Sequence, residues 1–288
     1  MLVTIITPTY NREAFLPAAI ESVLAQTYKN FEFIIVDDGS EDNSRKLIES
    51  YAEKDSRIKY LYQENQRQSV ARNYALSVAN GDFICFLDSD NYWPNDKLEK
   101  SLKAFADHPE ADIVYGDCIT IDEQGAELHR NNMRRYSGRI AGLLLKDNFI
   151  SMNTTMTRRK CFDEMGGMSG KRRVADDYDL WLKFSARYRF QYIPEFLAYY
   201  RVMENQISSN KKLRFETNES IIQDFLAAYP HAVTAQEKKV GLCAFYTRKA
   251  RHYAATDKRE SYASIRKALA VSPFNFGVWR ALVKILIS

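Results

Sequence analysis

The sequence predicts an α/β protein with a mixed, mainly parallel sheet flanked by helices and followed by a C-terminal α-helical region. Short apolar runs rich in β-branched residues alternate with helical segments of about 11–15 residues, which is the pattern of βαβ units. From about residue 211 the apolar spacing becomes helical throughout. The chain is 45% hydrophobic and 27% charged, so it can form the sizeable core that such a sheet needs.

Predicted strands are apolar runs that stop at proline, acidic or turn-forming residues. They cover residues 2–7, 31–36, 58–62, 83–87, 111–115, 118–121, 151–157 and 190–200. Predicted helices carry apolar residues three or four positions apart, as Phe15, Ala19 and Val23 do. They cover residues 12–26, 42–54, 69–79, 94–106, 214–229, 234–255, 259–271 and 276–287. Residues 129–139 are basic and irregular, which favours a mobile loop or a solvated connection.

Targeting signals and cysteine spacing limit the classes of protein to which this chain can belong. Met1 leads straight into an apolar strand without a basic stretch, so we expect no signal peptide. No apolar run reaches about 18 residues, the length of a membrane span. The cysteines Cys85, Cys118, Cys161 and Cys243 form no zinc or redox spacing. We therefore expect reduced thiols in a cytoplasmic protein.

Charge is distributed unevenly along the chain. Residues 206–288 contain 14 Lys/Arg and 6 Asp/Glu, a net +8, so residues 1–205 carry the remaining 27 and 31, a net −4. The basic part ends in an apolar helix that carries Arg280 and Lys284. Residues 274–288 can therefore lie peripherally on an anionic membrane, or the helix can pack on the preceding helices while the charges face water. We expect no nucleic-acid partner.

Two carboxylates follow the predicted strand 83–87. Asp88 and Asp90 are two positions apart, so along an extended chain both point to the same side. Carboxylate oxygens gathered in this way suit Mg²⁺ or Mn²⁺, although an Asx turn that satisfies local backbone groups gives the same pattern. The carboxyl ends of parallel strands share one edge of a sheet, where ligands bind. The segments 8–10 and 37–38 should therefore lie at the same edge.

A second acidic pair, Asp176 and Asp177, opens a helix with an aromatic stripe. A carboxylate at that position can be a helix cap or a first-turn residue that interacts with the helix dipole. It can equally serve as a general base. Trp181, one turn from Tyr178 and Phe184, is better explained as core than as a platform for an acceptor.

Several motifs together resemble family 2 glycosyltransferases. They are the segments 6–12 (ITPTYNR), 20–27 (IESVLAQT), 35–40 (IVDDGS), 71–73 (ARN), 81–82 (GD), 87–90 (LDSD) and 176–181 (DDYDLW). The resemblance covers roughly residues 1–205 in the order typical of that family. It implies a GT-A fold in which residues 1–92 bind nucleotide and residues 93–205 bind acceptor, with 206–288 as a helical appendage. It also implies an inverting transferase that uses a nucleotide-sugar and a divalent cation.

The resemblance also implies roles for individual residues. Asp177 would be the general base, and Asp176 would cap the helix or contact the acceptor. Asp90 would ligate Mn²⁺ or Mg²⁺. The nucleotide would be bound by Pro8, Thr9, Tyr10, Asp38, Arg72, Asp88 and Ser89. Within that set Asp38 would accept a hydrogen bond from uracil, Arg72 would lie near the base or diphosphate, and Asp88 with Ser89 would contact ribose or metal-bound water.

The chain departs from the family pattern at two places. Met203 stands where relatives often have a histidine after the Tyr-Arg pair, which leaves the metal to Asp90, diphosphate and water. Gln66, Arg67 and Gln68 stand where relatives commonly have glycines. These changes bear on metal affinity and on the loop before residues 71–73.

The expected function is transfer of a hexose or N-acetylhexosamine from a UDP-sugar to a glycan or lipid-linked glycan, on the inner face of the plasma membrane. One alternative is a nucleotidyltransferase, which would need a loop rich in glycine and in basic residues after the first strand. A dinucleotide enzyme would need G-x-G-x-x-G there, and the chain has Pro8-Thr9-Tyr10-Asn11. Another alternative is a non-catalytic nucleotide-sugar-binding or scaffold protein.

Overall fold

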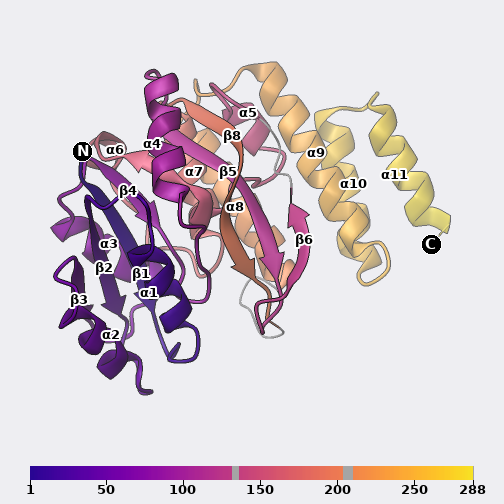
Figure 1. The fold of residues 1–288 in the computed structure, drawn as a ribbon. Coiled ribbons are helices and arrows are strands. Elements are labelled where there is room, and N and C mark those ends of the chain that lie inside the picture. The colour runs from indigo at the N-terminus through magenta and orange to yellow at the C-terminus, as the bar shows by residue number, and fades with distance from the viewer. Residues whose placement is uncertain (132–135, 204–209, 288) are drawn as a thin grey trace.

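The computed structural model describes residues 1–131, 136–203 and 210–287. A central sheet separates two layers of helices, and a group of C-terminal helices extends the molecule on one side (Figure 1). The described strands form one sheet in the order β3-β2-β1-β4-β7-β5-β6, with β8 paired to β5. The fold is therefore the mixed α/β architecture with helical appendage that the sequence predicts.

The first half of the sheet is parallel. It consists of β1 (Val3–Thr9), β2 (Phe31–Asp37), β3 (Ile58–Tyr62) and β4 (Phe83–Phe86). Both faces of β1, β2 and β4 are covered, so every residue of these three strands is buried. Alternate residues divide between two cores: Ile5 packs with α1 (Leu16–Leu24) and α2 (Ser44–Ala52), and Ile6 packs with α3 (Gln68–Val78).

The second half of the sheet is mixed. It contains β5 (Ile113–Ile121), β6 (Glu127–Asn131), β7 (Met156–Arg158) and β8 (Phe190–Arg201). Strand β7 runs antiparallel between β4 and β5, whereas β8 runs parallel to β5. Helix α4 (Lys97–Asp107) covers one face, and α6 (Lys160–Met165) and α7 (Asp176–Ser185) lie on the other.

Three sequence predictions in this half are wrong in detail. The two strands predicted at 111–115 and 118–121 are one strand, β5, whose pairing with β8 shifts on both sides of Asp117. The strand predicted at 151–157 is instead a short 3₁₀ turn, η1 (Met152–Thr154), followed by β7. Part of the irregular segment 129–139 belongs to β6, and residues 132–135 lie outside the described residues.

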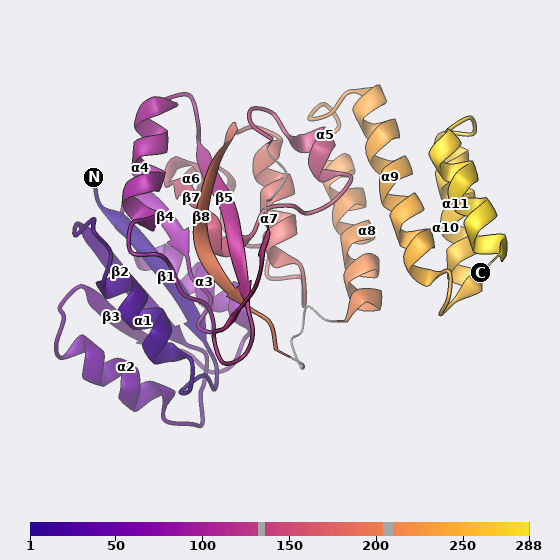
Figure 2. The same cartoon turned by 45° about the vertical axis from the view of Figure 1, so that its right-hand side comes forward.

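The C-terminal helices pack on the body of the protein through α5 (Ala141–Leu144) and α7 (Figure 2). They are α8 (Lys211–Ala228), α9 (Ala235–Tyr253), α10 (Lys258–Val271) and α11 (Phe276–Ile287). Gly241 lets α9 approach α5 closely, since a Cβ atom there would lie 2.5 Å from Cβ of Leu145. Side chains of α8, α9, α10 and α11 join the same buried cluster as α3 and α7, so the core is continuous with the appendage.

No helix within the described residues is both long and apolar enough for a membrane span. The cysteines Cys85, Cys118, Cys161 and Cys243 are all buried, and none of them forms a disulfide.

Candidate active site

The carboxyl ends of β1, β2 and β4 form one edge of the sheet. Thr9 pairs with Asp37, and the N–H of Asp38 donates to the carbonyl oxygen of Thr9 over 2.8 Å. On the other side of β1 the N–H of Leu87 donates to the carbonyl oxygen of Ile6 over 3.0 Å. The polar residues that follow these strands therefore meet at one edge, as the sequence predicts.

The end of β1 presents one buried hydroxyl and one exposed ring. Pro8 and Thr9 are buried, whereas Tyr10 is 42% exposed. Among the described residues Oγ1 of Thr9 has no hydrogen-bond partner. A buried polar atom without a partner is costly unless a ligand or water satisfies it. This geometry is compatible with the expected placement of Pro8, Thr9 and Tyr10 against a nucleotide.

Asp38 is buried and organises the loop before α3. Its Oδ1 accepts hydrogen bonds from Nε2 of Gln63 at 2.6 Å and from the N–H of Gln66 at 2.8 Å. The segment in which the chain departs from its relatives is therefore fixed to the same carboxylate that is expected to contact uracil. Arg67, the next residue, has φ +76° and ψ 162°, a backbone conformation that favours glycine.

The carboxylate of Asp88 is fully engaged by side chains. Its Oδ1 accepts from Nη2 of Arg72 at 2.5 Å, and its Oδ2 accepts from Nδ2 of Asn153 at 2.9 Å. The amide of Asn153 also accepts from the backbone N–H of Asp88 at 2.7 Å. Ser89, which follows, is buried. Asp88 thus ties the loop after β4 to α3 and to η1.

Asp90 is the residue of this loop that suits a cation. Its own backbone N–H favours the ionised carboxylate, and Nε of Arg201 donates to its carbonyl oxygen at 2.9 Å. Burial, and then the charge of Asp88, raise the pKa of Asp90 to about 6. A bound cation would remove this penalty. No group of three or more His, Cys, Asp or Glu side chains in the described residues could hold a metal by itself, so a cation at Asp90 would need further ligands.

The second acidic pair lies at the start of α7. Ala175 precedes the helix in a left-handed conformation, φ +59°, and its side chain makes no cap hydrogen bond. Asp177 accepts hydrogen bonds from Nδ2 of Asn148 at 2.9 Å and from the N–H of Tyr178 at 2.8 Å. Burial, and then the charge of Asp176, raise the pKa of Asp177 to about 6. Asp177 is therefore a carboxylate poised to take a proton near neutral pH.

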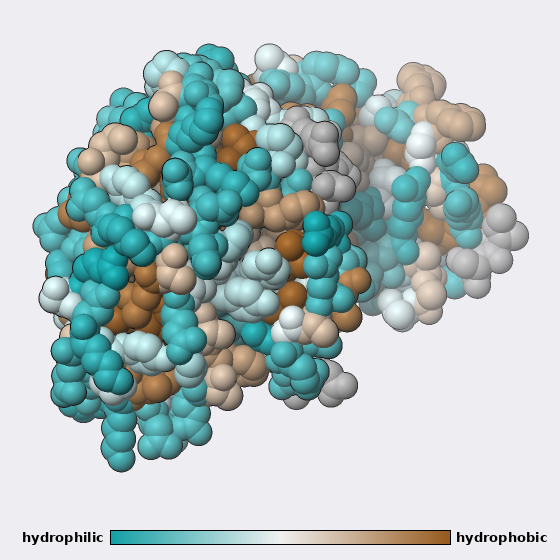
Figure 3. All heavy atoms as spheres, in the orientation of Figure 1, coloured by the Kyte–Doolittle hydropathy of each residue, from teal (hydrophilic) through white to brown (hydrophobic). Residues whose placement is uncertain are grey.

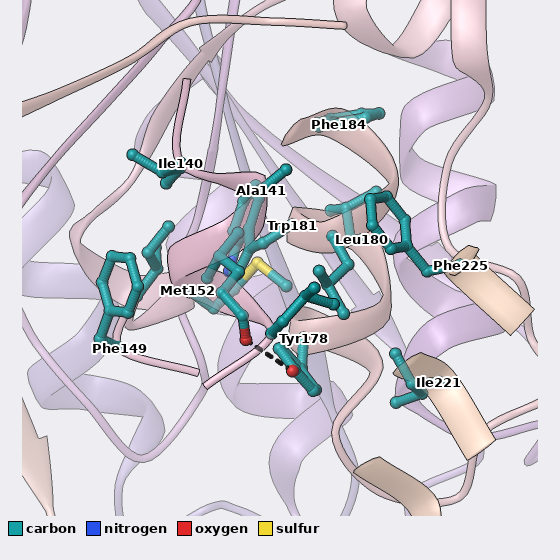
Figure 4. Close-up of a cluster of buried hydrophobic side chains, with 14 of the residues drawn as sticks. Ile140, Ala141, Phe149, Met152, Tyr178, Leu180, Trp181, Phe184, Ile221 and Phe225 are labelled. Carbon is teal, nitrogen blue, oxygen red and sulfur yellow. Dashed lines mark hydrogen bonds between the residues drawn. The ribbon is translucent and has the colours of Figure 1, made fainter. Parts of the chain in front are cut away.

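Helix α7 is anchored in a core of buried apolar side chains that includes Tyr178, Trp181 and Phe184 (Figure 4). The hydroxyl of Tyr178 donates to the carbonyl oxygen of Leu144 over 2.7 Å. Trp181 and Phe184 are fully buried. Trp181 is thus a core residue, as the sequence favours, and the first turn of α7 has little freedom to move.

Arg72 joins the two acidic groups. Its Nη1 contacts Oδ2 of Asp176 at 2.6 Å, and its Nη2 contacts Oδ1 of Asp88 at 2.5 Å. Asp176 also accepts from Nε2 of Gln68 and from Oγ of Ser69, both at 3.0 Å. Asp176 is therefore held by α3 and does not cap its own helix by a side-chain hydrogen bond. Arg72 reaches the loop after β4 through Asp88.

Sequence reasoning did not identify Asn148, Asn153 or Gln68 as site residues. Asn148 lies in a segment with no predicted element and Asn153 lies inside the strand predicted at 151–157, and their partners are 29 and 65 positions away. Gln68 belongs to the segment that departs from the family pattern, and that departure is the signal that could have identified it. Met203 is described, but residues 204–209 that follow it lie outside the described residues.

Comparison with known proteins identifies the family. The family model described as glycosyl transferase family 2 matches residues 4–177. The chain is a family 2 glycosyltransferase. TuaG of Bacillus subtilis, named as a teichuronic acid biosynthesis glycosyltransferase, is 35% identical over 216 residues, which are 73% of this chain and 82% of TuaG. Uncharacterized glycosyltransferases of Rickettsia are longer than this chain. The Rickettsia bellii protein is 35% identical over 185 residues, which are 64% of this chain and 26% of that protein.

Solved structures show that this family 2 glycosyltransferase has the GT-A fold. Residues 1–349 of Staphylococcus aureus TarS in complex with UDP-GlcNAc superpose with a TM-score of 0.74 at 20% identity, over 95% of this chain and 82% of that one. The mannosyltransferase PcManGT of Pyrobaculum calidifontis, in complex with GDP-Man and Mn²⁺, superposes with a TM-score of 0.59 at 19% identity. That match covers 99% of this chain and 86% of the other.

Proposed function

We propose that the protein transfers a hexose or N-acetylhexosamine from a UDP-sugar to a hydroxyl of a glycan or lipid-linked glycan, with inversion and with Asp177 as the general base. One observation carries the proposal. Arg72 connects Asp88, at the nucleotide edge of the sheet, to Asp176, which adjoins Asp177. Groups from distant parts of the chain therefore meet in one site, as a single displacement requires.

The named relatives support the choice of substrates. TarS is seen with UDP-GlcNAc, and TuaG is named for the biosynthesis of an anionic glycan. PcManGT binds GDP-Man, so the fold alone does not select uridine. The proposal of a UDP-sugar rests on Asp38, whose buried carboxylate can accept a hydrogen bond from N3–H of uracil.

The reaction needs one proton acceptor and one leaving-group stabiliser. Asp177 removes the proton of the acceptor hydroxyl as its oxygen attacks C1 of the sugar, and the bond from C1 to the diphosphate oxygen breaks. Because no enzyme nucleophile intervenes, the configuration at C1 inverts. Asp90 would hold Mn²⁺ or Mg²⁺, which supplies Lewis-acid stabilisation of the diphosphate. Thr9, Tyr10 and Ser89 border the nucleotide at the edge of the sheet.

The surface of helix α11 is suited to a peripheral contact with an anionic membrane. Such a contact would place the enzyme on the inner face of the plasma membrane. Its inner side chains Val278, Ala281 and Ile285 are buried against the preceding helices. Its outer side chains are apolar and exposed: Phe276 80%, Trp279 48%, Val283 55% and Leu286 63%. Figure 3 shows brown and tan side chains at the surface over the C-terminal helices, on the right of the view. Exposed Arg280 and Lys284 add the positive charge that attracts anionic lipid.

The decisive experiment compares Asp177→Asn with Asp179→Asn. Both residues lie in the acidic first turn of α7, but no hydrogen bond or ion pair joins the Asp179 carboxylate to another described residue. Purified proteins are assayed for UDP release from a panel of UDP-sugars with Mn²⁺ and acceptor, and UDP binding is measured by calorimetry. We expect Asp177→Asn to lose turnover by about 10²–10⁴-fold while binding UDP, and Asp179→Asn to retain turnover. Binding of UDP by the wild type without any turnover would favour a non-catalytic protein.

A further inference from the structure

Arg72 is the buried cation at the centre of the site. It is 2% exposed, and its guanidinium lies between two carboxylates that come from opposite sides of the site. Only one of them, Asp88, belongs to the nucleotide edge. The other, Asp176, is itself 7% exposed and is the immediate neighbour of Asp177. A charge this deeply buried is retained only when its partners compensate it.

The charges around Asp177 do not balance without Arg72. Asp88, Asp176 and Asp177 form a group of carboxylates, and Arg72 is the cation whose attraction acts on Asp177. Asp176 repels the ionised form of Asp177, and Asn148 stabilises it by a hydrogen bond. Arg72 neutralises Asp176 directly and so weakens this repulsion.

Several charged groups on the elements packed against α7 are paired elsewhere. Glu164 on α6 pairs with Arg187, and Arg172 pairs with Asp224 on α8. Arg248 on α9 contacts Asp147, which precedes Asn148. Helix α5 carries no charged residue. Asp176 and Arg72 are the charged residues that act most strongly on Asp177.

We propose that Arg72 is a positioning residue for the general base, acting through Asp176. This inference rests on the proposed function of Asp177. Arg72 holds Asp176 against α3, fixes the first turn of α7, and cancels the charge that would otherwise keep Asp177 protonated. The other terminal nitrogen of the guanidinium, Nη2, holds Asp88. Arg72 therefore also fixes the position of Asp177 relative to the edge of the sheet at which the nucleotide would bind.

The proposal makes opposite predictions for the two partners of one ion pair. Arg72→Gln leaves the negative charge of Asp176 uncompensated, which raises the pKa of Asp177. The acidic limb of the kcat/KM–pH profile should therefore move to higher pH by on the order of one pH unit. Asp176→Asn removes the charge that repels ionised Asp177, so the acidic limb should move to lower pH. A residue with a purely structural role would lower activity in both variants and move the limb in neither. Arg72→Lys keeps the charge and should restore a limb close to that of the wild type, with a lower kcat.

The test measures kcat/KM from pH 5 to 9 in saturating Mn²⁺ for these variants and for Arg72→Gln/Asp176→Asn, with thermal unfolding as a check on folding. The double variant removes both buried charges, so it remains informative if Arg72→Gln does not fold. The acidic limb of the double variant should lie at a lower pH than the limb of Arg72→Gln. If Arg72→Gln is unfolded, the limb of the double variant should lie at a pH no higher than in the wild type. Limbs that shift in the same direction in Arg72→Gln and Asp176→Asn, or a double variant with a limb above the wild type, would overturn the role of Arg72. Full activity of Asp177→Asn would instead refute the proposed function, so the two failures are distinguishable.

Discussion

Nδ2 of Asn148 donates a hydrogen bond to Oδ2 of Asp177 over 2.9 Å. The other end of the same amide, Oδ1, accepts from the backbone N–H of Ile150 at 3.2 Å. The amide is therefore fixed with its donor toward the carboxylate. Oδ1 of Asp177 accepts from the N–H of Tyr178, so each oxygen of the proposed base is oriented by one donor and retains a lone pair for an acceptor hydroxyl.

Replacing Asn148 by alanine should impair the chemical step. The variant loses one hydrogen bond to an ionised carboxylate, worth about 1.5–3 kcal/mol, so kcat should fall by about tenfold or more while KM for the donor changes little. Asn95→Ala is the control, because Asn95 is exposed and its side chain has no hydrogen bond among the described residues. An unchanged kcat in Asn148→Ala would mean that the amide does not orient the base.

Activity should depend on pH through Asp177. The base must be ionised, and its pKa is raised by burial and by Asp176 to about 6, so kcat/KM should fall as the pH drops through about 6. Asp90 has a pKa raised to about 6 by burial and by Asp88, but saturating Mn²⁺ would keep it ionised. The limb that remains in saturating Mn²⁺ is then that of Asp177. A profile that stays flat down to pH 4.5 would contradict this assignment.

The outer face of α11 should determine membrane binding. Trp279→Ser/Leu286→Ser removes two exposed apolar side chains, and we expect at least about tenfold weaker flotation with vesicles that contain phosphatidylglycerol. Binding of the wild type should weaken in high salt and with phosphatidylcholine alone, since Arg280 and Lys284 contribute by charge. Tyr62→Ser is the control, because Tyr62 is 51% exposed on β3. Equal flotation of all three proteins would exclude α11 as the anchor.

Glycine at position 67 should stabilise the protein. Arg67 adopts φ +76° and ψ 162°, which costs a residue with a side chain about 1–3 kcal/mol. Glycine relieves this strain but adds freedom to the unfolded chain, so Arg67→Gly should raise the free energy of unfolding by about 1 kcal/mol. Urea denaturation with an unchanged m value measures the effect. Gln66→Gly, at a position with negative φ, should instead lower the free energy of unfolding.

The sequence predicted the parallel half of the sheet and its polar edge because each strand there is a continuous apolar run that ends directly in the polar residues of interest. The strand 83–87 and the carboxylates Asp88 and Asp90 form one contiguous signal. In β5 the signal was interrupted at Gly116, where any side chain would meet the carbonyl oxygen of Glu195, and one strand was taken for two. A three-residue strand such as β7 is too short to carry a period.

The contacts inside the site were not predictable in the same way. Arg72 and Asp176 are 104 positions apart, and Asp88 and Asn153 are 65 apart. Which donors meet which carboxylates depends on how the helices pack, and hydrophobic periodicity says nothing about such pairs. The side-chain roles of Asn148 and Gln68 could be read only from the folded chain.

The insertion of β7 between β4 and β5 also constrains how the enzyme is made. During synthesis β4 has emerged long before Met156–Arg158, and until then its backbone N–H and C=O groups on that side have no partner. A ribosome-bound or truncated chain that ends before Arg158 therefore exposes a strand edge on which other chains can add. Fragments cut at residue 92 should aggregate, whereas chains that extend beyond Arg158 can cover this edge of β4.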